Sequence, residues 1–308
     1  MLKKRGVLAL NEQQVRRLEK KFYERKAKLP DCANDFLRSL QYHKELQTQL
    51  EYAKDIHLFL EYLSEHCFEN LPVKEITIEH LAKVTEEDAM GFIDYITQFK
   101  REFISVGGNK TIQEFTNGPH GKERKRASIK KFYDYFLTRG KLGRNPMMNI
   151  EIKVKKKPIK PRLSYSEVSL MLDTALTTNP HPFRALRNYV ILKVLAYTGI
   201  RISELTGIDI DDIWEHRDEM IVTRKGGYQE VIYINQNIRE DLYHYLNERK
   251  EIKNVQKGHQ NALFLSQQMR RIDPRSVRKM IRTTAEKAGI KITVTPHTFR
   301  RTFGWKHY

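Results

Sequence analysis

Residues 198–205 read TGIRISEL, and the second half of the chain is best interpreted outward from this stretch. The apolar run of residues 186–197 predicts a helix, and Gly199 ends it, because glycine readily adopts the left-handed backbone that closes a helix. A new helix begins directly afterwards, so Arg201 stands at a fixed corner between two helices. Two interpretations stay open: Arg201 pairs with Glu204 across a surface helix turn, or it presents its charge to a ligand.

The charge of the chain favours a polyanionic partner. Its 308 residues include 56 Lys and Arg against 38 Asp and Glu, a net charge of +18. Neutralising phosphates releases condensed counterions, so an excess of this size is typical of proteins that bind nucleic acid. The alternative is a soluble protein that is merely basic.

A β-hairpin is predicted after the TGIRISEL stretch. Residues 220–223 (MIVT) and 231–234 (VIYI) flank the turn Lys225-Gly226-Gly227. Lys225 at the tip is either a solvated charge or an ammonium that reaches a DNA groove and donates a proton. Arg224 beside it favours the solvated charge.

Residues 295–303 read TPHTFRRTF. Pro296 suits the first turn of a helix, which makes His297 and Arg300 neighbours on one face. Two cationic donors on one face suit the paired non-bridging oxygens of a phosphate. A histidine beside an arginine is more often structural, so this segment alone decides little.

Together and in this order, TGIRISEL, the Lys-Gly-Gly hairpin and TPHTFRRTF resemble the first arginine, the lysine and the His-x-x-Arg box of tyrosine recombinases, the phage integrase family. The resemblance covers about residues 31–308 and is to Xer-like and lambda-integrase-like members. Residues 128–146 (SIKKFYDYFLTRGKLGRNP) also resemble the last helix of that family's core-binding domain.

The resemblance implies a catalytic site made of Arg201, Lys225, His297 and Arg300. The two arginines would clamp the scissile phosphate and stabilise its transition state. The lysine would protonate the leaving 5′ oxygen, and the histidine would assist by hydrogen bonding and proton transfer. The family's nucleophile is a tyrosine that forms a 3′-phosphotyrosyl link, and no metal ion or cofactor is implied.

The expected fold is mainly α with a small antiparallel β-sheet, arranged as a helical core-binding domain and a mixed α/β catalytic domain. Apolar residues recur at helical spacing in residues 46–63, 89–99 and 129–137, whereas residues 107–125, with four glycines and a proline, predict a loop. The expected parts are a basic N-terminal arm (1–30), a helical, SAM-like DNA-binding domain (31–149), a basic linker (150–162) and a catalytic domain with its C-terminal part missing (163–308).

The linker is the most basic stretch of the chain. Residues 153–162 (KVKKKPIKPR) hold six cations, no acid and two prolines, which favour an extended path. The alternative is a solvated surface loop. We expect its cations and the hairpin arginine to lie near DNA phosphates: Lys153, Lys155, Lys156, Lys157, Lys160, Arg162 and Arg224.

The end of the sequence departs from the family pattern. The family's last conserved His or Trp and its tyrosine are expected two to three dozen residues beyond Arg300, whereas the sequence stops at Tyr308. Tyr308 lies eight residues beyond Arg300, which is about 12 Å along a helix axis, too far for a nucleophile that must approach within about 3.5 Å. We therefore expect a truncated chain without a nucleophile, deficient in cleavage, with an exposed apolar patch around Phe299 and Phe303.

Other features exclude several classes of protein. Cys32 and Cys67 are the only cysteines and form no CxxC motif, which argues against a disulfide framework or a zinc site and favours a reducing cytoplasm. No apolar run approaches the roughly 18 to 20 residues of a membrane span. The aspartates near residue 210 are better explained by helix capping than by a metal site: Asp209, Asp211 and Asp212.

These observations predict a cytoplasmic site-specific recombinase or integrase of a mobile genetic element. Its partner is double-stranded DNA, and the family resemblance implies a tetramer on paired DNA sites. The alternative is a DNA-binding regulator that occupies recombination sites without catalysis. A third interpretation is a helical nucleic-acid-binding protein with no tie to this family.

Overall fold

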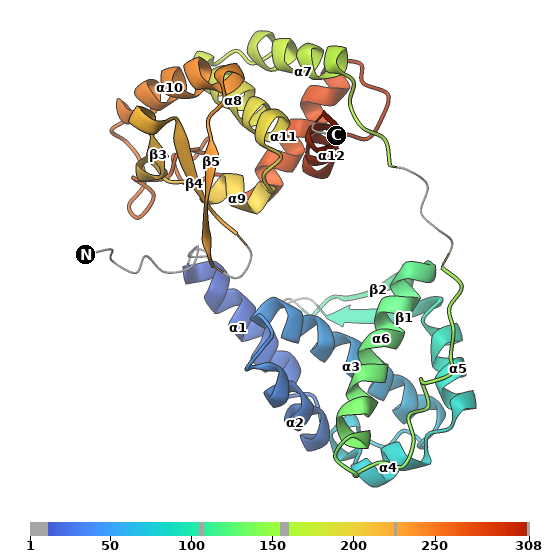
Figure 1. Ribbon diagram of the computed structural model, residues 1–308. Coiled ribbons are helices and arrows are strands. Elements are labelled where there is room, and N and C mark those ends of the chain that lie inside the picture. Colours follow the sequence, from blue (N-terminus) through green and yellow to red (C-terminus); the bar gives the residue numbers. More distant parts are fainter. Residues whose placement is uncertain (1–11, 105–107, 155–159, 225–226, 307–308) are drawn as a thin grey trace. The chain divides into compact units, whose positions relative to one another are not determined.

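The computed structural model describes residues 12–104, 108–154, 160–224 and 227–306, and the chain divides into two compact units (Figure 1). The N-terminal unit covers Leu10–Lys157, and the C-terminal unit covers Pro158–Tyr308. Each unit has its own apolar core. Both are built mainly from helices with a small antiparallel sheet, which confirms the expected fold class.

The N-terminal unit packs its helices around a core rich in phenylalanine and leucine. Its elements are α1 (Glu12–Lys26), α2 (Asp31–Leu40), α3 (Leu46–His66), a 3-10 turn (Val73–Glu75), α4 (Ile78–Lys83), α5 (Glu86–Tyr95), β1 (Gln98–Ile104), β2 (Lys110–Thr116) and α6 (Pro119–Leu137). The long helix α3 contacts α1, α2, α5 and α6 and therefore forms the centre of the unit.

Helix α1 belongs to this unit, although the sequence suggested a separate arm up to residue 30. It packs against α3, and Phe22 and Leu29 are buried in the shared core. Its outer face keeps the basic residues, among them Arg16, Arg17 and Lys20, exposed. The helical unit therefore starts before residue 31, because an amphipathic helix with one buried aromatic residue can dock on α3.

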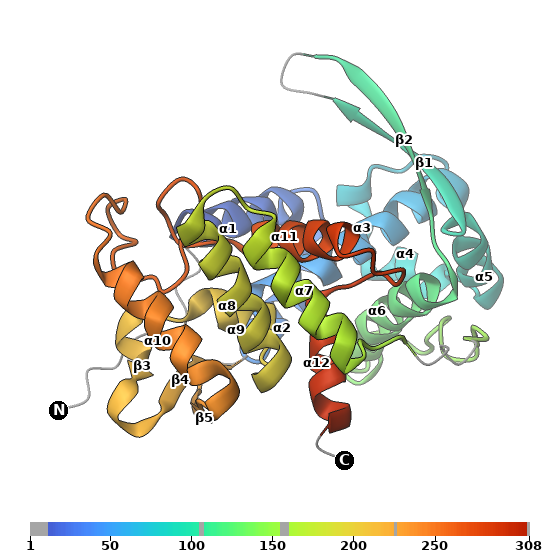
Figure 2. The same cartoon turned by 90° about the horizontal axis from the view of Figure 1, so that it is seen from above.

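The loop predicted for residues 107–125 is wrong. Strands β1 and β2 form a two-stranded antiparallel ribbon that extends away from the helices of its unit in Figure 2, and α6 begins at Pro119. Phe99 and Phe115 lie opposite each other in the register, with ring centroids 5.3 Å apart, and anchor the ribbon at its base. The glycines that suggested a loop instead serve the hairpin turn, where Gly108 has φ +79°, and the start of α6.

The C-terminal unit is arranged around helix α8 (Pro182–Thr198), whose buried residues lie on several sides of it. It contacts α7 (Tyr165–Thr177), α9 (Ile202–Gly207), α10 (Gln236–Lys250) and α12 (Pro296–Lys306), and α11 (Pro274–Lys287) packs on α7 and α9. A three-stranded sheet, in the order β3-β4-β5, completes the unit: β3 (Ile213–Trp214), β4 (Glu219–Thr223) and β5 (Gln229–Tyr233), with 3-10 turns at Ile210–Asp212 and Glu215–Arg217. The β4–β5 hairpin matches the one predicted from residues 220–234.

Within the described ranges, no helix combines the length and the apolar character that a bilayer crossing requires.

One buried carboxylate joins the two longest helices of the N-terminal unit. Asp55 on α3 is 3% exposed and accepts hydrogen bonds from Arg124 Nη1 and Nη2 of α6, at 2.6 and 2.9 Å, and from Ser128 Oγ at 2.8 Å. Three donors compensate for the removal of the carboxylate from water. Arg124 is half exposed, so its charge keeps part of its hydration.

We expect Asp55→Ala to lower the free energy of unfolding by about 2 kcal/mol, since it removes the carboxylate that binds Arg124 and leaves Ser128 only the Arg124 carbonyl as acceptor. Glu51→Ala on the same helix is the control, because Glu51 makes only exposed contacts with Lys54 and Gln47, and the substitution should change stability by less than about 0.5 kcal/mol. Urea unfolding followed by circular dichroism measures both. Equal effects of the two substitutions would show that Asp55 does not join α3 to α6.

Candidate functional site

The corner at Arg201 is built as the sequence suggested. Gly199 caps α8 in the left-handed conformation, at φ 61°, and donates its N–H to the Leu195 carbonyl. Arg201 has extended backbone and forms the N-cap of α9. Its side chain is 47% exposed, so its guanidinium can reach a ligand in solvent.

Glu204 binds Arg201 from the interior of the protein. The Arg201 N–H donates to Glu204 Oε2 at 2.7 Å, and Arg201 Nη1 donates to Oε1 at 2.8 Å. The expected pair therefore exists, but it is not a pair of two surface residues, because Glu204 is only 2% exposed. A buried carboxylate of this kind fixes the orientation of the Arg201 guanidinium, which itself stays accessible to solvent.

Arg224 is the second cation on Glu204. Its Nη1 donates to Glu204 Oε2 at 2.6 Å, and its Nε and Nη2 donate to Glu230 at 2.6 and 2.9 Å. Burial alone would raise the pKa of Glu204, but the hydrogen bonds from Arg201 and the charges of Arg224 and Arg201 hold this pKa below its usual value. Hydrogen bonding to Glu230, together with the charges of Glu230 and Glu204, raises the pKa of Arg224.

Arg224 therefore ties the β4–β5 hairpin to α9 at the point where its turn begins. The sequence predicts DNA binding for Arg224, and the structure gives its guanidinium two carboxylate partners within the protein. Lys225, the next residue and the expected general acid, lies outside the described residues.

Helix α12 carries the other two expected residues. Thr295 and Thr298 exchange hydrogen bonds at its start, and Pro296 occupies its first position. His297 is exposed, and Arg300 is half-buried with Nη1 donating to the Gly199 carbonyl at 2.7 Å. This bond brings Arg300 to the end of α8, two residues before Arg201 in the chain.

Glu230 is the second carboxylate of this corner. Its pKa is lowered first by the hydrogen bond from Arg224, and further by the positive charges of Arg224, Arg201 and Arg300. The structure thus brings together the two arginines predicted from distant motifs. Glu204 and Glu230 take part in the same site and were not anticipated as members of it. The i, i+3 spacing from Arg201 is the sequence pattern that indicates Glu204. No sequence pattern indicates Glu230, because strand pairing determines its position.

Gly199 also decides where α12 packs. A Cβ added to Gly199 would lie 2.5 Å from Cδ1 of Phe303, so the ring fills the space that a side chain would take. Phe299, one helical turn earlier, is fully buried. The expected exposed patch around Phe299 and Phe303 is therefore wrong for Phe299, because α12 turns this residue into the core of its own unit.

The linker cations fall partly outside the described residues. Lys153, Lys160 and Arg162 are exposed, which suits contact with a charged partner. Lys155, Lys156 and Lys157 lie in the range that the structure does not describe.

The aspartates near residue 210 have partners within the protein. The Asp209 N–H donates to Asp212 Oδ2 at 2.9 Å, and Arg271 pairs with Asp209. Among the described residues, no group of three or more His, Cys, Asp or Glu could hold a metal ion.

Comparison with known proteins defines the class. Residues 161–307, nearly the whole C-terminal unit, match the model of the phage integrase family. Two solved recombinases share the fold. The XerH site-specific recombinase bound to a difH substrate has a TM-score of 0.62 at 18% identity, over 85% of this chain and 70% of that one. A lambda integrase dimer bound to a core site has a TM-score of 0.61 at 14% identity, over 89% of this chain and 88% of that one. The C-terminal unit therefore belongs to the tyrosine recombinase, or phage integrase, family.

Curated relatives agree with this assignment. The chain is similar to the tyrosine recombinase XerD of Listeria monocytogenes, at 24% identity over 89% of this chain and 83% of the relative. It is also similar to the tyrosine recombinase XerC of Caldanaerobacter subterraneus, at 26% identity over 90% and 74%. A tyrosine recombinase of Agathobacter rectalis is 34% identical over 60% of this chain and 62% of that protein.

Gly199→Ala should destabilise the C-terminal unit through both backbone strain and the clash with Phe303. Gly289→Ala is the matched control, because Gly289 also has a positive φ, +68°, but nothing lies within 4 Å of an added Cβ. The control should cost about 1 kcal/mol from the left-handed backbone alone, and Gly199→Ala at least about 1 kcal/mol more. Thermal unfolding of both variants measures the difference, and equal costs would contradict the proposed role of the Phe303 contact.

Glu204→Gln should lower stability in a pH-dependent manner. Since the pKa of Glu204 in the folded protein lies below the ordinary value of 4.5, its stabilising effect is present above pH 4.5 and is lost as the pH falls through the lower folded pKa. The loss of stability in Glu204→Gln, about 1 to 3 kcal/mol near neutral pH, should therefore shrink below pH 4.5. Glu251→Gln, with a side chain 81% exposed, is the control and should leave the free energy of unfolding nearly unchanged in the same denaturation series.

Proposed function

We propose that this chain is a site-specific DNA recombinase or integrase that binds double-stranded DNA and grips the scissile phosphate with Arg201 and Arg300. One observation carries the proposal. The two arginines come from motifs 300 − 201 = 99 residues apart and meet at the C-terminal end of α8, where Arg300 is bonded to the Gly199 carbonyl. Two guanidinium groups at one exposed corner match the two non-bridging oxygens of a phosphodiester.

The chemistry follows from the charge that develops at the phosphorus. Arg201 and Arg300 stabilise the additional negative charge of the five-coordinate transition state, and Glu204 holds Arg201 in place without neutralising the site. His297 supports the same phosphate by hydrogen bonding and proton transfer, and Lys225 protonates the leaving 5′ oxygen. A tyrosine supplies the nucleophile in this reaction class, with a 3′-phosphotyrosyl intermediate that conserves the bond energy for rejoining.

The binding partners follow from the charge and from the relatives. The net charge of +18 and the exposed cations of the linker favour a DNA duplex, with the N-terminal unit as the core-binding domain. One structural neighbour is a lambda integrase tetramer bound to a Holliday junction, at a TM-score of 0.61. We extend self-association on paired DNA sites to this chain on that basis.

The first test is binding to duplexes enriched by in vitro selection, measured by fluorescence anisotropy over a series of salt concentrations. Arg201→Ala and Arg300→Ala should each weaken binding about tenfold and reduce the slope of log K against log salt by about 0.9, the value for one lost phosphate contact. Arg239→Ala is the matched control, since Arg239 is also 47% exposed and paired with one carboxylate, but lies on α10. If all three variants behave alike, Arg201 and Arg300 are ordinary surface cations and the proposed phosphate grip is wrong.

Covalent chemistry separates recombination from the alternative of a regulator. A recombinase is expected to form a covalent adduct with a nicked substrate, detected by denaturing electrophoresis, and this adduct should disappear in Arg201→Ala. A regulator binds the selected duplex without forming an adduct.

A further inference from the structure

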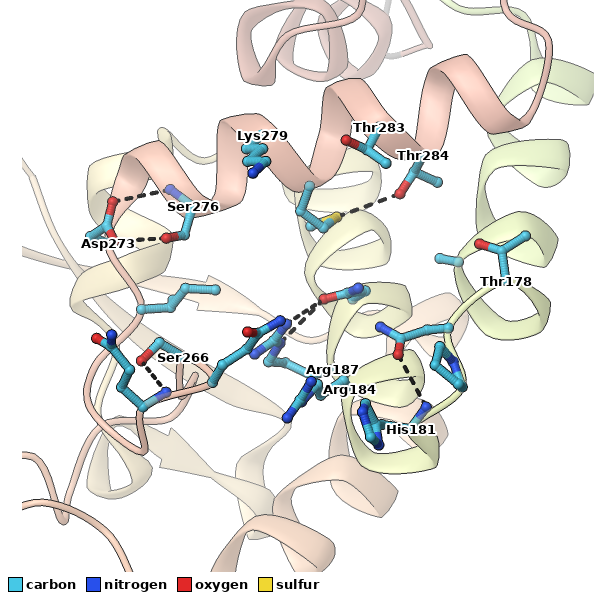
Figure 3. A pocket seen from close by; sticks show the side chains of 18 of the residues that line it. Thr178, His181, Arg184, Arg187, Ser266, Asp273, Ser276, Lys279, Thr283 and Thr284 are labelled. Atoms are coloured by element: carbon cyan, nitrogen blue, oxygen red, sulfur yellow. Dashed lines mark hydrogen bonds between the residues drawn. The ribbon is translucent and has the colours of Figure 1, made fainter.

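A second group of cations lies at the other end of helix α8. A cleft of about 670 Å³ opens there between the N-terminal half of α8, the segment of residues 266–273 and α11. Figure 3 shows Arg184 and Arg187 of α8 on one side of this cleft, with Lys279 and Ser276 of α11 across from them. All of its lining residues belong to the C-terminal unit.

The charge of the cleft is unbalanced. Its lining includes Arg184, Arg187, Arg270, Lys279 and Lys287 against a single carboxylate. That carboxylate, Asp273, is already engaged as the N-cap of α11, where it accepts from the N–H groups of residues 275 and 276 and from the hydroxyl of residue 276. With five cations and one carboxylate in its lining, the cleft therefore has a net positive charge.

Arg187 is the most constrained of these cations. It is only 7% exposed, and its guanidinium is held by neutral acceptors: Nη1 donates to the Leu265 carbonyl at 2.5 Å, and Nε and Nη2 donate to Asn188 Oδ1 at 3.2 and 2.8 Å. Burial, and then the positive charge of Arg184, lower the pKa of Arg187. A buried guanidinium without a carboxylate is costly, and an anion that enters the cleft lowers this cost.

The dimensions and lining of the cleft define the ligand. Its volume lies within the range of sites for small ligands, roughly 300 to 1,000 Å³. Its five cations outnumber its single carboxylate, so positive charge is left for an anion. Hydroxyl groups of Ser266 and Thr283 add donors suited to phosphate oxygens. Among the described residues that line the cleft, His181 has the only aromatic ring, and no Phe, Tyr or Trp offers a nucleobase a larger stacking surface. The chemistry of the cleft is thus that of successive phosphate groups rather than of bases.

This cleft is separate from the corner at Arg201. Helix α8 has 17 residues from Pro182 to Thr198, which is about 24 Å along its axis. Arg184 lies in its first turn and Gly199 directly after its last, so one phosphate cannot contact both sites.

We propose that the cleft is a second anion site of this protein and binds two or more linked phosphate groups. They come from the backbone of a DNA duplex or from a soluble polyphosphate. The DNA source rests on the proposed function, whereas the phosphate chemistry of the cleft does not.

The test uses tripolyphosphate as the probe and isothermal titration calorimetry as the measurement. All proteins carry Arg201→Ala and Arg300→Ala, so that the candidate active site contributes nothing and the result is independent of the proposed function. In this background, Arg184→Gln with Lys279→Gln should weaken tripolyphosphate binding at least tenfold. Arg282→Gln, a 68% exposed cation of α11 that does not line the cleft, should leave binding unchanged. Arg187 is left intact, because it also holds the backbone at residue 265.

Competition then identifies the source of the phosphates. If a 30-base-pair duplex displaces tripolyphosphate from the control protein but not from a protein already lacking Arg184 and Lys279, the backbone of DNA occupies the cleft. If tripolyphosphate stays bound in the presence of saturating duplex, the ligand is a soluble polyphosphate. The proposal is overturned if the double substitution in the cleft changes neither tripolyphosphate affinity nor the salt dependence of duplex binding, with thermal stability preserved.

Discussion

The C-terminal unit depends on the carbonyl group of Gly199. The last carbonyls of a helix have no intrahelical donors, and at the end of α8 an arginine from a distant part of the chain supplies one, Arg300 Nη1 at 2.7 Å. The left-handed backbone of Gly199 turns the chain so that Arg201 begins the next helix, and its missing side chain leaves room for Phe303. One residue therefore sets both the direction of Arg201 and the docking of α12. Any side chain at this position would disturb the two arginines together.

Bringing like charges together requires compensation, and the carboxylates are placed where they do not block access. Glu204 is buried and accepts hydrogen bonds from both Arg201 and Arg224. Its negative charge therefore lies on the interior side of the two guanidinium groups and leaves their solvent side open to a ligand. Glu230 binds Arg224 at the base of the hairpin and experiences the fields of Arg201 and Arg300. With three guanidinium groups and two carboxylates, the corner keeps a net positive charge for a phosphate.

The helix boundaries could be predicted from the sequence because their signals are local: the glycine at 199 and the proline at 296 each act through their own backbone. Residues 98–116 were missed because two short strands around glycines resemble a loop until the register places Phe99 against Phe115. The burial of Glu204 could not be predicted either, since an i, i+3 spacing does not say which residue of a pair faces the core. The cleft was equally hidden, because its cations come from three elements that only tertiary packing brings together.

The partners of an arginine decide how much of its charge is left for a ligand. Arg201 binds one carboxylate and stays 47% exposed, and the other arginines lie on either side of this case. Arg224 binds two carboxylates, which neutralise its charge, so its contribution is to fix the hairpin. Arg187 and Arg300 are held by main-chain carbonyls or an amide, which orient a guanidinium without neutralising it. Arg249 is held in the same manner but is fully buried, so no ligand can reach it. Where such a carbonyl-held guanidinium borders an open cleft or an exposed corner, its unneutralised charge is already oriented, and a phosphate gains the electrostatic energy without first having to order the side chain.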